Sequence, residues 1–359
     1  MISSFFQKSC FLVLFSILGC QFSQAQSTDK SLYFKKPAVN HLESLPIGNG
    51  HLGGMIFGNP NQDRIILNEK TLWSGGVQDA DRENAHQYLS EIQTLLLNGN
   101  NKEAEALLQE HFVSKGVGSG EGIGANEHYG SYQTLGDLLI SWADTIQGYE
   151  NYSRVLDLQD AIATTTWKRK GVTFTQEAFS SIADDVMVIK LSASKAAQLS
   201  FAIGLDRKEN VAGDDILLMT GQLPNKDLAG MKYAAMLKVV QEGGTIKNTG
   251  KQLEVDGADV CYLIIAAATD YNIDAPAEPI GDPVKEVSKT ISDFKIATAR
   301  ANHMQSYQEY FNRNSFQLTS QDKGVSKLST PERLQRYAEG NEDAQLPVLY
   351  YNYGKYLLI

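Results

Sequence analysis

The stretch LPIGNGHLGGMIFGNPNQDRIILNEKTLWSGG, residues Leu45–Gly76, decides how the N-terminal part of this chain is expected to fold. It contains seven glycines and reads as short apolar runs joined by tight turns, a pattern that indicates twisted antiparallel strands. Asn49, His51, Glu69 and Trp73 lie within these runs and turns. Such a stretch suits a sugar, because glycine lets the backbone come close to a ligand and tryptophan covers an apolar face.

The segment Gly48–Gly53 also satisfies the G-x-G-x-x-G spacing of a dinucleotide-binding turn. That turn needs a strand before it and a helix that begins at the last glycine, so that the helix N-terminus meets the pyrophosphate. Here Pro46 precedes the glycines, and a further apolar strand follows them. We therefore expect a tight β-connection instead of a dinucleotide site, and no cofactor.

The strand pattern continues up to about residue 270. Arg169-Lys170-Gly171 is a short glycine-containing turn between two alternating runs, and it predicts a β-hairpin. The predicted strands are Tyr132–Trp142, Ala163–Lys168, Val172–Phe179, Val186–Ser192, Leu199–Leu205, Tyr233–Val240, Lys251–Val255 and Val260–Ala268. Many short strands at this spacing predict a mainly β fold built as a large antiparallel β-sandwich.

Helices are expected in two parts of the chain. Arg82–Leu97 and Asn101–Phe112 carry apolar residues at helical spacing and predict a helical hairpin inserted between strands. Beyond the proline-rich segment Asp274–Pro283 the pattern turns helical again. The helices expected there are Val284–Arg313, Pro331–Tyr337 and Ala344–Ile359. The last of them is apolar on most sides, as a buried helix would be, and no partner for it is apparent in the chain.

Composition and charge narrow the kinds of partner. The chain has 359 residues with 32 Lys and Arg against 42 Asp and Glu, and its formal net charge of −10 argues against a nucleic-acid partner. A neutral glycan fits this balance. The six histidines show no metal-binding spacing, so we expect no metal site. Cys261 lies in an apolar run and is expected to be an inert core residue.

The first 25 residues predict an export signal. Phe11–Leu18 is an apolar run too short to span a bilayer, and Ser23-Gln24-Ala25 offers small residues to a signal peptidase. The mature protein would then be periplasmic or secreted. The alternative is a lipoprotein that carries a lipid anchor at Cys20. No other apolar run in the sequence approaches membrane-spanning length.

These segments together resemble the N-terminal part of glycoside hydrolase family 95, the inverting α-L-fucosidases. Leu45–Gly53 and Leu67–Gly76 are similar to the hallmark segments LPIGNGxLG and LNExTLWSGG of that family. Later landmarks that match in the same order are Tyr132–Leu139, Arg154–Leu158, Ala267–Tyr271, Pro331–Leu334 and Tyr353–Ile359. The chain departs from the family pattern at Lys70, Val77 and Thr134.

The resemblance implies a domain organisation. A sandwich of the type found at the N-terminus of glycoside hydrolases is expected at residues 26–275, with the helical hairpin at 82–112 inside it. Linker helices are expected at 276–340, and 341–359 would begin an (α/α)6 barrel that is cut short. The family keeps its catalytic residues on the barrel, beyond the last landmark. We therefore expect no catalytic residue in this chain and no activity from it alone.

The resemblance also implies a function. We expect an exported inverting α-L-fucosidase that releases terminal L-fucose from fucosylated glycans, with an α-L-galactosidase as the nearest alternative in the family. Asn49, His51, Glu69 and Trp73 are then the expected substrate-binding residues. The alternative for these four is structural, as parts of a tight β-connection, a core tryptophan and a carboxylate that holds loop amides. From another class, the chain is a non-catalytic carbohydrate-binding or structural sandwich.

Overall fold

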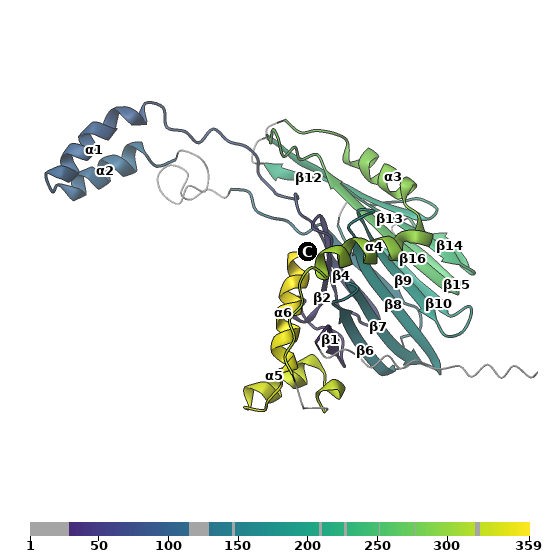
Figure 1. Ribbon diagram of the computed structural model, residues 1–359. Helices are drawn as coiled ribbons and strands as arrows, with labels where there is room; N and C mark the ends of the chain where they lie inside the picture. The colour runs from purple at the N-terminus through teal and green to yellow at the C-terminus, as the bar shows by residue number, and fades with distance from the viewer. Residues whose placement is uncertain are drawn as a thin grey trace, which may run out of the picture.

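The computed structural model describes residues 29–114, 129–145, 148–207, 210–225, 228–250, 252–276, 278–319 and 324–359. Within them two antiparallel sheets stack face to face, and helices lie along the larger sheet and at its edge (Figure 1). The prediction of a mainly β sandwich followed by helices is confirmed. The predicted export signal at residues 1–25 lies outside the described residues, and so does Cys20.

Every pair of neighbouring strands in the described residues is antiparallel. The larger sheet runs, in spatial order, β1 (Ser31–Phe34), β6 (Glu150–Asp157), β7 (Ile162–Arg169), β8 (Val172–Ser181), β9 (Val186–Ala193), β16 (Val260–Thr269), β13 (Leu228–Glu242), β12 (Ile216–Asn225) and β11 (Asn210–Ala212). The smaller sheet runs β14 (Thr245–Asn248), β15 (Leu253–Ala258), β10 (Leu199–Leu205), β5 (Gly136–Trp142), β4 (Gln62–Glu69), β3 (Leu52–Ile56) and β2 (Leu45–Gly48).

The hairpin predicted at Arg169–Gly171 is confirmed. Arg169 pairs with Val172, which leaves Lys170 and Gly171 as a two-residue turn between β7 and β8. Both turn residues have positive φ, 50° and 70°, as the twist of a tight hairpin requires. A glycine tolerates this conformation at no steric cost.

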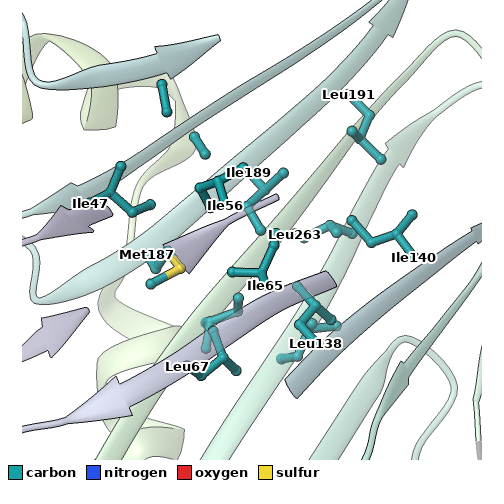
Figure 2. Packing of buried hydrophobic residues seen from close by; sticks show 14 of the residues in the cluster. Ile47, Ile56, Ile65, Leu67, Leu138, Ile140, Met187, Ile189, Leu191 and Leu263 are labelled. Carbon is teal, nitrogen blue, oxygen red and sulfur yellow. The ribbon is translucent and has the colours of Figure 1, made fainter. Parts of the chain in front are cut away.

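The core lies between the sheets and follows from the alternation of side chains along each strand. In β10 the residues Leu199, Phe201, Ile203 and Leu205 are buried while those between them are partly exposed. Figure 2 shows how the two inner faces interdigitate, with Leu138 and its neighbours from the smaller sheet meeting residues of the larger one. Burying a leucine or isoleucine in such a core contributes about 1.5–3 kcal/mol each.

The larger sheet is covered on its outer face as well, by the helices α3 (Pro283–Asp293) and α4 (Ile296–Phe311) (Figure 1). This second cover explains why β16 reads as a continuous apolar run. Cys261 of that strand is fully buried, and burial raises the pKa of its thiol to about 12, which confirms an inert core residue.

The single long helix predicted at Val284–Arg313 is wrong. The backbone is extended at Phe294 and Lys295, which divides the segment into α3 and α4. The cause is tertiary packing. Val287 and Ile291 of α3 and Ala299 of α4 all pack on the outer face of the larger sheet, and the extended pair redirects the chain between them.

The inserted helical hairpin is present, but its first helix begins later than predicted. A short 3-10 helix (Ala85–Tyr88) precedes α1 (Leu89–Leu97), and α2 (Asn101–His111) follows. Figure 1 shows the hairpin well away from the sheets. Because the hairpin does not pack on the sheets, Ile92 is the only buried residue of α1 and Ala104 the only one of α2. These two residues lie where the helices pack against each other.

The C-terminal helices pack beside β1 and β2 (Figure 1). They are α5 (Thr330–Ala338) and α6 (Gln345–Leu358); two further 3-10 turns are His41–Glu43 and Val325–Lys327. The expectation that α6 has no partner in the chain is wrong, because the Tyr356 hydroxyl donates to the Pro46 carbonyl at 2.7 Å. The helix buries one face only, and Tyr350 and Leu358 on it are exposed. None of the described helices is long and apolar enough to cross a membrane.

Candidate functional site

The connection between β2 and β3 is a tight turn that presents His51. Gly50 has a φ of 82°, which turns the chain back on itself. The side-chain oxygen of Asn49 accepts hydrogen bonds from the backbone N–H groups of His51 and Leu52, at 2.9 and 2.7 Å. A strand follows the glycines, not a helix, so the expected tight β-connection is confirmed.

The His51 imidazole lies between two carboxylates. Its Nε2 is 2.8 Å from Glu69 Oε1, and its Nδ1 is 2.9 Å from both oxygens of Asp185. The hydrogen bond to Asp185 and then the one to Glu69 raise the pKa of His51 from 6.5 to about 9, against the opposing effect of burial. At neutral pH His51 is therefore a cation that donates through both nitrogens.

Glu69 ends β4 and is almost completely buried, with 1% of its surface exposed. Besides His51, it accepts hydrogen bonds from the Thr71 backbone N–H at 2.9 Å and from the Thr71 hydroxyl. That hydroxyl lies 2.5 Å from the hydroxyl of Thr269, at the end of β16 in the larger sheet. Through the Thr71 hydroxyl, the Glu69 carboxylate therefore links the end of β4 in the smaller sheet to the end of β16 in the larger sheet.

Sequence reasoning missed Thr71 and Asp185, and of these Asp185 is the one that contacts His51. It lies in the turn between β8 and β9 with a φ of 51°, a conformation that Asp adopts more readily than most residues. Its carboxylate also accepts from Asn49 Nδ2 at 3.1 Å. Burial alone would raise the pKa of Asp185, but the hydrogen bond and charge of His51 outweigh it and lower the pKa. The signal available was the Asp184-Asp185 pair between two apolar runs, a pattern typical of a tight turn.

We call Asn49, His51, Glu69, Thr71 and Asp185 the His51 network. Its two carboxylates are bridged by an imidazolium that fills the space between them, whereas an inverting glycosidase needs a water between its acid and its base. The network is therefore suited to holding the β2–β3 turn against the β8–β9 turn, and the smaller sheet against the larger one. It is not suited to cleaving a glycosidic bond. No group of three or more potential metal ligands of the His, Cys, Asp or Glu type occurs in the residues that the structure describes.

Trp73 lies outside this network. Half of its surface is exposed, and its ring meets the Tyr132 ring edge to face with centroids 5.8 Å apart. Burial, and after it the charge of Glu69, raises the pKa of Tyr132, whose hydroxyl donates to Asn68 Oδ1 at 2.9 Å. The indole lines a groove of about 510 Å³. Of the four expected substrate-binding residues, the structure therefore gathers Asn49, His51 and Glu69, and it places Trp73 outside their hydrogen-bond network, in this groove.

Comparisons with known proteins give a consistent result. Residues 32–274 match the family described as glycosyl hydrolase family 65, N-terminal domain, and residues 295–359 match the glycosyl hydrolase family 95 catalytic domain. The chain is 30% identical to alpha-L-fucosidase 2 of Arabidopsis thaliana, with 94% of this chain and 42% of that protein covered. It is 28% identical to the probable alpha-fucosidase A of Aspergillus niger, with 88% and 40% covered.

Among solved structures, a putative kojibiose phosphorylase from the human microbiome aligns with a TM-score of 0.44 at 9% identity, covering 79% of this chain and 38% of its own. The chain spans less than half the length of the curated relatives that it matches.

Proposed function

Because this chain belongs to the glycoside hydrolases, with a family 65 N-terminal domain that leads into a family 95 catalytic domain, we propose that it is part of an exported inverting α-L-fucosidase. The substrate would be a glycan that carries terminal L-fucose, and L-galactose is the alternative sugar. The observation that carries this proposal is the match to alpha-L-fucosidase 2 of Arabidopsis thaliana, which is 30% identical to this chain over 94% of its length.

In this proposal the described residues support the reaction without performing it. The carboxylates of Glu69 and Asp185 both accept hydrogen bonds from His51, and Glu69 also accepts one from the Thr71 backbone N–H. Glu69 is buried and paired with His51, so it is not placed to contact a leaving group. The acid and the base would come from the catalytic domain of the whole protein.

The test compares the whole protein, read from its source DNA, with the chain of residues 26–359. Hydrolysis of p-nitrophenyl α-L-fucopyranoside and of the matching α-L-galactopyranoside is measured for both. We expect the whole protein to prefer the fucoside and the chain to be silent. Proton NMR of an early time point should show β-L-fucose, since inversion converts the α-linkage to the β-anomer. Fucose release by the chain alone, or α-L-fucose as the first product, would contradict the proposal.

Export is tested separately. Cell fractionation of a C-terminally tagged protein should place it outside the cytoplasm, and the N-terminal residue of the mature form should be Gln26. A lipid-modified Cys20 at the N-terminus would favour the lipoprotein alternative, and an intact Met1 in the cytoplasm would exclude both.

A second candidate function is a non-catalytic carbohydrate-binding sandwich. The exposed indole of Trp73 favours it, because a tryptophan held half in solvent is a common platform for a sugar ring. A chain that binds a glycan and belongs to a whole protein without glycosidase activity would support this candidate over the fucosidase.

A further inference from the structure

The groove beside Trp73 is built from three segments that are distant in sequence. One wall is the segment Trp73–Val77, the second is formed by Asn225 of β12 with Ala229, Gly230 and Met231 of β13, and the third by Asp270, Tyr271, Pro276 and Pro279, after β16. Its volume of about 510 Å³ lies within the range of small-molecule sites. We call it the Trp73 groove. It contains no residue of the His51 network.

The Trp73 wall is fixed by contacts on both sides. The Ser74 backbone N–H donates to the Ser131 carbonyl at 2.9 Å, and that of Gly75 donates to the Pro224 carbonyl at 2.8 Å. Gly76 lies so close to Asn225 that an added Cβ would come within 2.5 Å of the Asn225 amide nitrogen. These contacts fix the backbone that follows Trp73, and the Tyr132 ring packs edge to face against the indole. A ligand that stacks on it would therefore lose little free energy to ordering the site.

The lining combines aromatic faces with neutral and acidic oxygen groups. Tyr271 is 38% exposed and joins Trp73 in the groove, and Pro279 adds a rigid apolar surface. The Asn225 amide also lines the groove, as does Asp270, which is held by a hydrogen bond from the Lys232 N–H to its Oδ1 at 2.9 Å. Among the described lining residues there is no Lys, Arg or His, so the groove does not suit a phosphate or a carboxylate.

Flat aromatic faces with one amide and one largely buried carboxylate match a neutral sugar ring, which presents C–H groups on its faces and hydroxyls around its edge. We propose that the Trp73 groove binds one neutral pyranose unit of a glycan, independently of the catalytic residues and of the His51 network. The choice of a sugar as the ligand class rests on the proposed function. The groove therefore gives the sandwich its own contact with the glycan.

Tryptophan fluorescence provides a direct assay of this site. The chain has three tryptophans, and Trp142 and Trp167 are buried, with 7% and 2% of their surface exposed. Only Trp73 is open to solvent, so a sugar on the groove should change its emission and protect it from acrylamide. The probes are methyl α-L-fucopyranoside, lactose and 2′-fucosyllactose, titrated into the chain.

We expect a saturable change in emission with at least one of these sugars and a lower quenching constant at saturation. Trp73→Phe should abolish the fluorescence change, and calorimetry should show about tenfold weaker binding for Tyr271→Ala, because stacked aromatic contacts dominate such sites. Asn225→Ala provides a second route if Tyr271→Ala does not fold. The control is Tyr350→Ala, a tyrosine on α6 that is 80% exposed and outside the groove, which should bind as the unchanged chain does.

No saturable change with any of the three sugars would overturn the proposal, and so would equal affinity of the unchanged chain, Tyr271→Ala and Asn225→Ala. A whole protein that hydrolyses fucosides while the chain binds none of the sugars refutes the Trp73 groove and leaves the proposed function intact. Sugar binding by the chain, lost in Tyr271→Ala, in a protein that hydrolyses no fucoside supports the groove and refutes the proposed function.

Discussion

Replacing His51 by glutamine tests whether the His51 network holds an ionised histidine. Folding raises the pKa of His51 from 6.5 to about 9, chiefly through the hydrogen bonds to Asp185 and Glu69. The protonated form therefore stabilises the folded protein fully below about pH 6.5, and this stabilisation is lost as the pH rises towards 9. His51→Gln removes the charge and keeps a side chain that can donate a hydrogen bond.

The size of the effect follows from the pKa difference. A difference of about 2.5 pH units corresponds to ~3.4 kcal/mol if none of it is screened. The His51 side chain is 27% exposed, and that of Asp185 is 50% exposed. Solvent screening of the Asp185 partner reduces this value, so we expect about 1–2 kcal/mol of pH-dependent stability.

The assay is urea unfolding of the chain, followed by circular dichroism at about pH 6 and about pH 9.5. The difference in unfolding free energy between the unchanged chain and His51→Gln should be about 1–2 kcal/mol larger at the lower pH. His41→Gln is the matched control, because His41 is exposed, and its pH dependence should follow that of the unchanged chain.

A difference that stays constant across this range would refute the reasoning, because it would mean that His51 is not held as a cation in the folded state. An NMR titration in which the His51 signal, assigned by its loss in His51→Gln, moves near pH 6.5 would refute it independently.

Two further predictions concern stability and are checked by guanidinium unfolding. Leu138→Ala removes a fully buried side chain between the sheets and should cost about 2–5 kcal/mol, whereas Leu97→Ala, at an 88% exposed position, should change stability by less than about 0.5 kcal/mol. Arg333→Gln leaves the Asp343 carboxylate without its buried ion-pair partner and should cost about 3–5 kcal/mol, whereas Arg313→Gln breaks an exposed pair and should cost under about 1 kcal/mol. Equal losses within either pair of variants would contradict the burial on which these values rest.

The sandwich was predictable because its information is local. Alternation along Leu199–Leu205, and a two-residue turn at Lys170-Gly171, specify a strand and a hairpin with little help from the rest of the chain. The break of the predicted helix at Phe294 and Lys295 carried no such mark, since neither glycine nor proline stands there. It arises from docking against the larger sheet, which only the folded sheet defines.

The candidate site shows the same division. The sequence by itself determined that Asn49, His51, Glu69 and Trp73 lie near one another along the chain, and that glycines turn the backbone between them. Tertiary structure alone decided that Asp185, over 130 residues away, completes the contacts of His51, and that Trp73 lines a groove outside the His51 network. The physical reason is that a hydrogen bond or a groove depends on where strand ends meet in space, and sheet pairing brings together residues that are far apart in sequence.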